Sequence, residues 1–171
     1  MSAVKQVETP EPLKQKLDAL GIAAKTVEHA PLFTVEDGAD IRHHFRGGHT
    51  KNLFLKDKKG QLWLVVAEHG TKVDMNWLQK RLPSGRLSFG KPDLMLEVLG
   101  VTPGSVTPFS LMNDTDCRVI AVLDKKLLDD FEVLNFHPLS NDKTTEITPQ
   151  DLLKFIDSCG HKTVIVDFLK G

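Results

Sequence analysis

The sequence predicts a mixed α/β protein of the α+β kind, in which a mainly antiparallel, curled sheet or partial barrel is flanked by helices. Segments with strand-like alternation outnumber amphipathic helical segments, and several connections between them are short. The order is not a strict strand–helix alternation, so a doubly wound parallel sheet is not expected. The chain has 171 residues, the size of one domain, and we expect residues 1–171 to form one.

The first 41 residues are predicted to form two helices with a strand between them. Residues 9–21 form the first helix, because Pro10 suits the first helical position and Gly21 can end a helix. Residues 23–28 are predicted to form a short strand. A second helix follows over residues 34–41, where a threonine can act as the cap.

The middle of the chain is predicted to form a β-hairpin and two further helices. Residues 51–55 and 61–67 alternate in the manner of strands, and a polar, glycine-ended turn joins them. Asp74 can cap a short helix. Residues 86–89 are predicted to be extended, and residues 92–99 to form a helix that the following glycine stops.

The last third is predicted to contain a loop, four strands and a helix. Residues 101–110 predict a loop, because they hold two prolines, a glycine and alternating hydroxyls. Three β-branched runs then predict strands over residues 119–123, 131–136 and 144–147. A capping box at residues 148–151 begins the last helix, which Gly160 ends, and residues 163–168 close the chain as a strand.

The net charge of −1 argues against a surface that is basic throughout, so DNA is not an expected partner. Basic residues nevertheless concentrate in two windows, residues 42–59 and 75–92. A local basic face can contact a few phosphates, and the candidates are Arg42, Arg46, Lys80, Arg81 and Arg86. The alternative is that such residues are ordinary solvated side chains, which we prefer for the turn at residues 58–60.

Other signals point to a cytoplasmic protein without a cofactor. No apolar run approaches the roughly 20 residues of a membrane helix, and the N-terminus lacks the apolar core of a signal peptide. Cys117 and Cys159 form no CxxC pair, so we expect two free structural thiols in a reducing compartment. We expect no metal or cofactor, since His43, His44 and His49 lack a zinc spacing and no phosphate-binding glycine loop or GxSxG elbow occurs.

Three short segments carry most of the functional signal. They are Thr-Lys-Asn-Leu-Phe-Leu at residues 50–55, Gly-Ser-Val-Thr-Pro at 104–108, and Asn-Phe-His-Pro at 135–138, with Asn141 just after. Together they offer a cation, an imidazole, an amide and a stiffened loop, a set that suits a small polar ligand or an activated ester. The loop could aim N–H groups at a ligand as an oxyanion hole does, although a merely connecting turn has the same composition.

Strand alternation places Lys51 on the face opposite to Asn52 and Phe54. Lys51 is then either a strand-end lysine that reaches solvent or a cation for a phosphate or a polarised carbonyl. His137 can donate, accept or transfer a proton. The alternative for His137 is a hydrogen-bonded histidine of the core.

The three segments, in this order, resemble the prolyl-tRNA synthetase editing-domain superfamily, also called the YbaK family, over nearly the whole chain. Within it the chain is most similar to the free-standing alanyl-tRNA(Pro) deacylases, the group that includes the prolyl-tRNA synthetase associated domain-containing proteins. That group carries a lysine–asparagine pair on an early strand, a GxxxP loop and a histidine after a strand end. Lys51-Asn52, Gly104 to Pro108, and His137 match them.

The resemblance implies the editing-domain fold and a hydrolase that removes alanine from the acceptor end of tRNA(Pro). A synthetase site shaped for proline discriminates poorly against the smaller alanine, so a second sieve is needed. The resemblance implies catalytic roles for Lys51, Gly104 and His137. It implies substrate binding by Asn52, Phe54, Ser105, Val106, Thr107, Pro108 and Asn141.

In that picture Lys51 meets the terminal phosphate or carbonyl, the loop backbone holds the aminoacyl group and the attacking water, and His137 borders the side-chain site. The basic residues named above meet acceptor-stem phosphates, and prolyl-tRNA synthetase is a second partner that the family suggests. Two alternatives share the fold. One is a deacylase for another small amino acid such as cysteine or serine, and the other is a non-catalytic module that binds tRNA or a synthetase.

Overall fold

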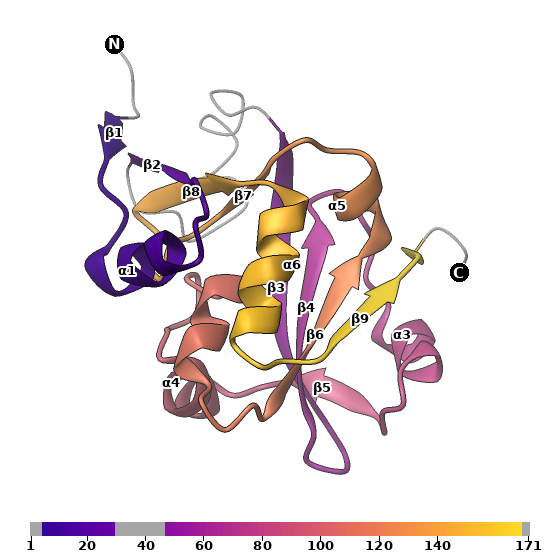
Figure 1. Ribbon diagram of the computed structural model, residues 1–171. Coiled ribbons are helices and arrows are strands. Elements are labelled where there is room, and N and C mark those ends of the chain that lie inside the picture. The colour runs from indigo at the N-terminus through magenta and orange to yellow at the C-terminus, as the bar shows by residue number, and fades with distance from the viewer. Residues whose placement is uncertain (1–4, 30–46, 169–171) are drawn as a thin grey trace.

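The computed structural model describes residues 5–29 and 47–168, which form one sheet with helices around it (Figure 1). The strands are β1 (Lys5–Val7), β2 (Lys25–Glu28), β3 (Gly48–Asp57), β4 (Leu62–Glu68), β5 (Leu87–Phe89), β6 (Val119–Asp124), β7 (Leu134–Phe136), β8 (Lys143–Ile147) and β9 (Thr163–Val166). The helices are α1 (Glu11–Ala19), α3 (Met75–Arg81), α4 (Pro92–Leu99), the 3-10 helix η1 (Pro108–Asn113), α5 (Lys125–Asp129) and α6 (Pro149–Ser158).

The nine strands form a mixed sheet in the order β1-β2-β8-β7-β3-β4-β6-β9, with β5 added beside β3. Five of the eight pairings are antiparallel and three are parallel. No pairing joins β1 to β9 in the described part of the chain, so the sheet stays open. The predicted fold class, a mixed and mainly antiparallel sheet flanked by helices, is confirmed.

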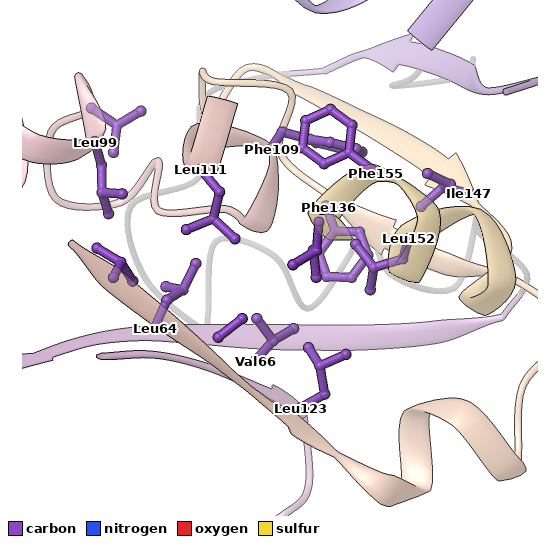
Figure 2. Packing of buried hydrophobic residues seen from close by; sticks show 14 of the residues in the cluster. Leu64, Val66, Leu99, Phe109, Leu111, Leu123, Phe136, Ile147, Leu152 and Phe155 are labelled. Atoms are coloured by element: carbon purple, nitrogen blue, oxygen red, sulfur yellow. The ribbon is translucent and has the colours of Figure 1, made fainter. Parts of the chain in front are cut away.

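Helices cover both faces of the sheet because its central strands are apolar on both. The buried run Leu62–Ala67 of β4 lies between β3 and β6. On one face α1, α4, η1 and α6 pack over a large core, here called the main core, that includes Phe54 and Phe109 (Figure 2). On the other face α3 covers a second core that includes Leu55 and Trp63. The predicted alternation of β3 is therefore confirmed, since consecutive residues enter different cores.

Several predicted boundaries are wrong where a tertiary contact replaces a local one. The hydroxyl of Thr9 bonds that of Thr26 at 2.7 Å instead of capping α1, which begins at Glu11. The predicted loop over residues 101–110 is a 3-10 helix from Pro108 onward, with the Thr107 hydroxyl accepting from the Phe109 amide.

Three further differences concern short elements. The strand predicted over residues 131–136 is paired only over Leu134–Phe136. Strand β1 and helix α5 were not predicted. The helix predicted over residues 34–41 lies outside the described residues. None of the described helices is long and apolar enough to cross a membrane.

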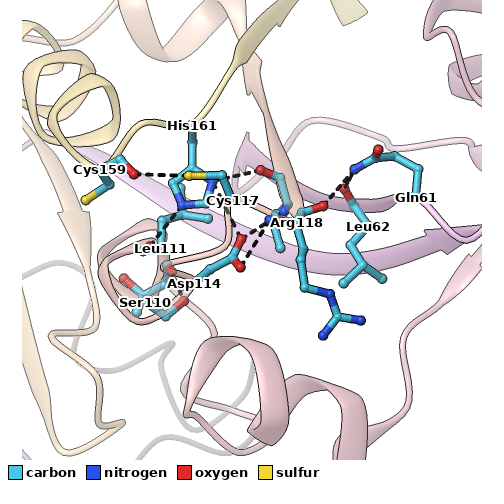
Figure 3. A network of polar contacts seen from close by, with 11 residues as sticks. Gln61, Leu62, Ser110, Leu111, Asp114, Cys117, Arg118, Cys159 and His161 are labelled. Atoms are coloured by element: carbon cyan, nitrogen blue, oxygen red, sulfur yellow. Dashed lines mark hydrogen bonds and ion pairs between the residues drawn. The ribbon is translucent and has the colours of Figure 1, made fainter.

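A buried polar network closes the main core where η1, β6 and the end of α6 meet (Figure 3). The His161 ring lies 2.8 Å from a backbone carbonyl of β6 and 3.0 Å from one of η1. The Asp114 carboxylate accepts from two backbone amides at the start of β6 and lies 3.7 Å from His161. The predicted free thiols border this network, with the Cys117 thiol donating to the Cys159 carbonyl at 3.5 Å.

Candidate active site

Among the described residues, the edge of β3 opposite β4 has strand partners only at its two ends. β7 pairs with the first two residues of β3, and β5 pairs with Leu55 to Asp57. Over residues 50–54 this edge has no strand neighbour in the described part of the chain, and we call it the open edge of β3. Two backbone hydrogen bonds show which residues of β3 point toward each edge. The His49 carbonyl accepts from the His69 amide on the β4 side (2.7 Å), and the Phe54 carbonyl accepts from the Gly90 amide on the opposite side (2.9 Å).

The main-chain groups of Asn52 face the open edge, while its side chain lies on the main-core face of β3. Because antiparallel backbone groups alternate in direction, the N–H and C=O of Asn52 point away from β4, as those of Phe54 do. The Asn52 Oδ1 atom is buried and has no hydrogen-bond partner among the described residues. A buried acceptor left unpaired costs roughly 1–3 kcal/mol, so a ligand that donates to it would recover that free energy.

Phe54 supports this edge from within the main core. Its side chain is 2% exposed. Gly90 lies so close that an added Cβ would sit 2.4 Å from the Phe54 ring, which explains why this position requires glycine. Phe54 therefore supports the open edge from the main core and is not itself on the surface.

The parallel pairing of β3 with β7 puts the segments that contain Lys51 and His137 on neighbouring strands. His49 lies opposite Asn135 in the last pair that joins these two strands. Lys51 and His137 each follow two residues later, so alternation keeps both on the face that His49 and Asn135 share. The Thr50 hydroxyl donates to the Asn135 carbonyl at 2.9 Å, and the Asn135 side-chain amide donates to the β3 backbone at 3.1 Å. These two bonds reinforce the short pairing between β3 and β7.

Lys51 lies on the face of β3 that carries the second core, because it shares parity with Leu53 and Leu55. Its side chain is partly buried. The ammonium group forms no ion pair with any of the residues that the structure describes. A partly buried lysine without such a partner suits an anionic or carbonyl ligand.

His137 is held by one backbone hydrogen bond and beside a second histidine. Its Nδ1 atom lies 3.0 Å from the Lys143 carbonyl oxygen, and its ring centroid lies 6.4 Å from that of His29. Burial is the largest influence on the pKa of His137 and lowers it, and the nearby His29 lowers it further. The hydrogen bond to Lys143 and the charge of Asp142 raise the pKa, but it stays below the ordinary value. The ring is therefore neutral at pH 7, and since a carbonyl can only accept, Nδ1 carries the hydrogen.

His29 is the residue that the sequence analysis missed. It is 5% exposed at the end of β2, and its Nε2 atom lies 2.8 Å from the Thr144 hydroxyl. The signal available was weak: alternation along residues 25–29 places His29 on the same face as Val27, but the pairing of β2 with β8 is invisible in the sequence.

The loop Gly104–Pro108 approaches the sheet from the main-core face. Gly104 is exposed with a φ of +93°, a conformation that favours glycine. Val106 packs against the main core. Beyond the loop, Phe109 meets Phe136 edge-on at 5.9 Å, which anchors the loop next to the strand that ends at His137.

The remaining buried and turn residues frame these groups. Ser105 and Thr107 are buried, and the Ser105 amide donates to the Thr102 carbonyl at 3.0 Å. Asn141 lies in the turn between β7 and β8 and is partly buried. The motif residues thus fall into two sets around the open edge: Lys51 and His137 on one face of the sheet, and Asn52, Phe54 and the loop on the other.

The candidate phosphate contacts lie away from these groups. Lys80, Arg81 and Arg86 lie on α3 and just before β5, at positions that are exposed or partly so, and the Arg81 guanidinium lies 4.3 Å above the Trp77 ring. The backbone bond from Lys58 to Arg86 places Arg86 just beyond the far end of β3, about 23 Å along the strand from Lys51 at roughly 3.3 Å per residue. Arg42 and Arg46 lie outside the described residues.

Comparisons with known proteins show the family to which the chain belongs. Residues 29–155 match the family model described as the aminoacyl-tRNA editing domain. The chain is 42% identical over 163 residues to the prolyl-tRNA synthetase associated domain-containing protein 1 of Bos taurus, covering 93% of this chain and 95% of that protein. It is 37% identical over 147 residues to the prolyl-tRNA editing protein ProX of Acetoanaerobium sticklandii, covering 85% and 89%.

A similar solved structure is that of a candidate trans-editing enzyme for prolyl tRNA synthetase. The TM-score is 0.72 at 20% identity, over 95% of this chain and 98% of that one, and this likeness concerns the fold alone. The family match spans the open edge of β3, the GxxxP loop and the His137 turn. The chain belongs to the aminoacyl-tRNA editing domain family.

Proposed function

We propose that this protein is a trans-editing deacylase that hydrolyses alanyl-tRNA(Pro) to alanine and free tRNA(Pro), in the cytoplasm where tRNA is charged. One observation carries the proposal. Lys51 and the neutral imidazole of His137 follow the paired residues of β3 and β7 on one face of the sheet, and Asn52, next to Lys51 in β3, carries a buried acceptor on the other face that has no partner among the described residues. The names of the relatives, which refer to prolyl-tRNA synthetase and prolyl-tRNA editing, support the choice of tRNA.

In the proposed reaction a water attacks the ester carbonyl carbon. The bond between that carbon and the terminal ribose oxygen breaks, and the ribose oxygen takes up a proton. Lys51 stabilises the negative charge that develops on the carbonyl oxygen, or it binds the permanent charge of the terminal phosphate and so positions the ester. The neighbouring ribose hydroxyl of the tRNA assists, so the protein needs no nucleophile of its own.

Asn52 and the loop from Gly104 to Pro108 hold the aminoacyl group from the other face. The Asn52 Oδ1 acceptor suits the ammonium group of the amino acid. His137 borders the site of the amino-acid side chain and Phe54 supports it, so that alanine enters and proline is excluded by size. This division follows the logic of a second sieve.

The acceptor stem contacts the basic group at Lys80, Arg81 and Arg86. The net charge of −1 keeps the intrinsic affinity for tRNA low, so these contacts make binding strongly dependent on salt. Association with prolyl-tRNA synthetase would raise the local concentration of freshly charged tRNA.

The test is Lys51→Ala assayed under single-turnover conditions on alanyl-tRNA(Pro). We expect hydrolysis to slow by at least about 100-fold, the scale of removing one charge interaction from the transition state, with an unchanged circular dichroism spectrum. Lys154→Ala, which removes an exposed lysine of α6, is the matched control and retains full activity. Hydrolysis that survives Lys51→Ala would remove Lys51 from the mechanism.

A further inference from the structure

Three hydrogen bonds hold three successive residues at the start of β8. The His29 backbone amide donates to the Asp142 carbonyl at 2.9 Å. The His29 Nε2 atom lies 2.8 Å from the Thr144 hydroxyl. Between these two anchors, the Lys143 carbonyl faces His137 Nδ1 at 3.0 Å.

The sheet register explains why these groups meet. β2, β8, β7 and β3 are consecutive neighbours. Val27 pairs with Thr144, and Phe136 pairs with Thr145, so His29 and Thr144 share the face to which register assigns His137. The opposite face at this point carries the buried bond between Thr26 and Thr145 at 2.7 Å.

We propose that His29 and Thr144 act as a clamp that positions the Lys143 carbonyl and thereby fixes His137 in its Nδ1–H tautomer, with Nε2 left as an acceptor. His29 and Thr144 are 5% and 8% exposed, so water does not easily replace their bond. Which nitrogen of a histidine carries the proton is set by the hydrogen bond that the other nitrogen makes. His29 is a positioning residue in this proposal, since it acts through residue 143.

The tautomer matters for the reaction, and only this consequence rests on the proposed function. An Nε2 lone pair can receive a hydrogen bond from the attacking water or from the ammonium group of the aminoacyl ester. With the hydrogen on Nε2 the same nitrogen could accept a hydrogen bond from neither of them. Burial holds the pKa of His137 below its ordinary value, which keeps the ring neutral and therefore makes the choice of tautomer meaningful at pH 7.

The first experiment reads the tautomer directly and needs no activity. Long-range proton–nitrogen NMR on protein labelled with ¹⁵N-histidine at pH 7.5 distinguishes a protonated ring nitrogen from an unprotonated one, and His137→Gln assigns the signal. We expect a protonated Nδ1 and an unprotonated Nε2 in the wild type. A His137 ring with its hydrogen on Nε2 would overturn the proposal whatever the protein hydrolyses.

The second experiment tests the clamp with a matched pair of variants. Thr144→Val removes the hydroxyl but keeps the shape, and Thr144→Ser keeps the hydroxyl. We expect the valine variant to show a mixture of both His137 tautomers and a deacylation kcat lower by on the order of tenfold, the effect of one net hydrogen bond, with KM nearly unchanged. The serine variant keeps the wild-type tautomer and a kcat within about twofold.

Further variants and outcomes test the clamp. If Thr144→Val does not fold, His29→Gln, whose amide can still reach the Thr144 hydroxyl, is expected to retain the Nδ1–H tautomer, and loss of that tautomer would overturn the proposal. An unaltered tautomer in folded Thr144→Val would also overturn it. If wild-type protein hydrolyses no aminoacyl-tRNA but shows the predicted NMR pattern, the clamp stands and the proposed function fails.

Discussion

Replacing Asp57 by asparagine should destabilise the protein strongly, although the two side chains have nearly the same shape. The buried carboxylate accepts four N–H groups. Oδ1 receives those of Lys59 (2.8 Å) and Gln61 (3.1 Å), and Oδ2 receives the Trp63 indole (3.3 Å) and the Gly85 amide (3.2 Å). Asparagine offers one oxygen and one NH₂ group, so two donors would face hydrogens. At about 1–3 kcal/mol for each buried unpaired donor, the protein should be less stable by about 2–6 kcal/mol.

For a chain of this length, each kcal/mol shifts the melting temperature by about 2–4 °C, so Tm should fall by on the order of 10 °C. Scanning calorimetry measures this, with Asp74→Asn as the matched control. Within the described part of the chain, Asp74 accepts only from the exposed amides of Asn76 and Trp77 at the start of α3, and asparagine is an equally good cap. Equal decreases in Tm in the two variants would refute the argument from acceptor count.

The pH dependence of stability gives a second test of the Asp57 site. Burial raises the pKa of Asp57, but the hydrogen bonds, led by that from Trp63, outweigh it and hold the pKa below its ordinary value. Stability from the ionised carboxylate is therefore present above the unfolded pKa of about 3.9 and is lost as pH falls through the folded value. The gap between wild type and Asp57→Asn should be largest near neutral pH and shrink in acid.

Two further predictions concern the loop and the RNA. Phe109→Leu keeps an apolar side chain but removes the edge-on packing against the rings of Phe136 (5.9 Å) and Phe155 (5.3 Å). At roughly 0.5–1.5 kcal/mol for each ring pair, the urea midpoint should drop by the equivalent of about 1–3 kcal/mol. An unchanged midpoint would contradict the stabilising role of these ring contacts. The double variant Lys80→Gln, Arg86→Gln should raise KM for alanyl-tRNA(Pro) without changing kcat, and should reduce the slope of log(kcat/KM) against log salt by about one for each phosphate that is no longer neutralised. A slope equal to that of the wild type would place the acceptor stem elsewhere on the surface.

Local sequence signals were sufficient for most elements, because their causes are local. Asp74 accepts from the first amides of α3, Gly100 adopts φ +70° at the end of α4, and Thr148 accepts from Asp151 at the start of α6. Each rests on a cap or a turn that a few neighbouring residues define. The alternation of β3 was also correct, since a strand between two cores must expose successive residues to different faces.

The site was harder to predict because its geometry depends on strand pairing between distant segments. The Lys51 and His137 segments were recognised from their residue types, but they lie on neighbouring strands because of two parallel pairs at the start of β3, and nothing local specifies those pairs. His29 lies more than 100 residues from its partner Thr144. The 3-10 helix at Pro108 was missed because Phe109 enters the main core, a tertiary contact that turn residues do not reveal.

The measurement that tests the central claim most directly is the deacylation of alanyl-tRNA(Pro), with prolyl-tRNA(Pro) and cysteinyl-tRNA(Pro) assayed beside it under the same single-turnover conditions. The account predicts rapid loss of alanine while proline and cysteine remain esterified. Comparable hydrolysis of prolyl-tRNA(Pro), or no hydrolysis of the alanyl ester, would contradict it.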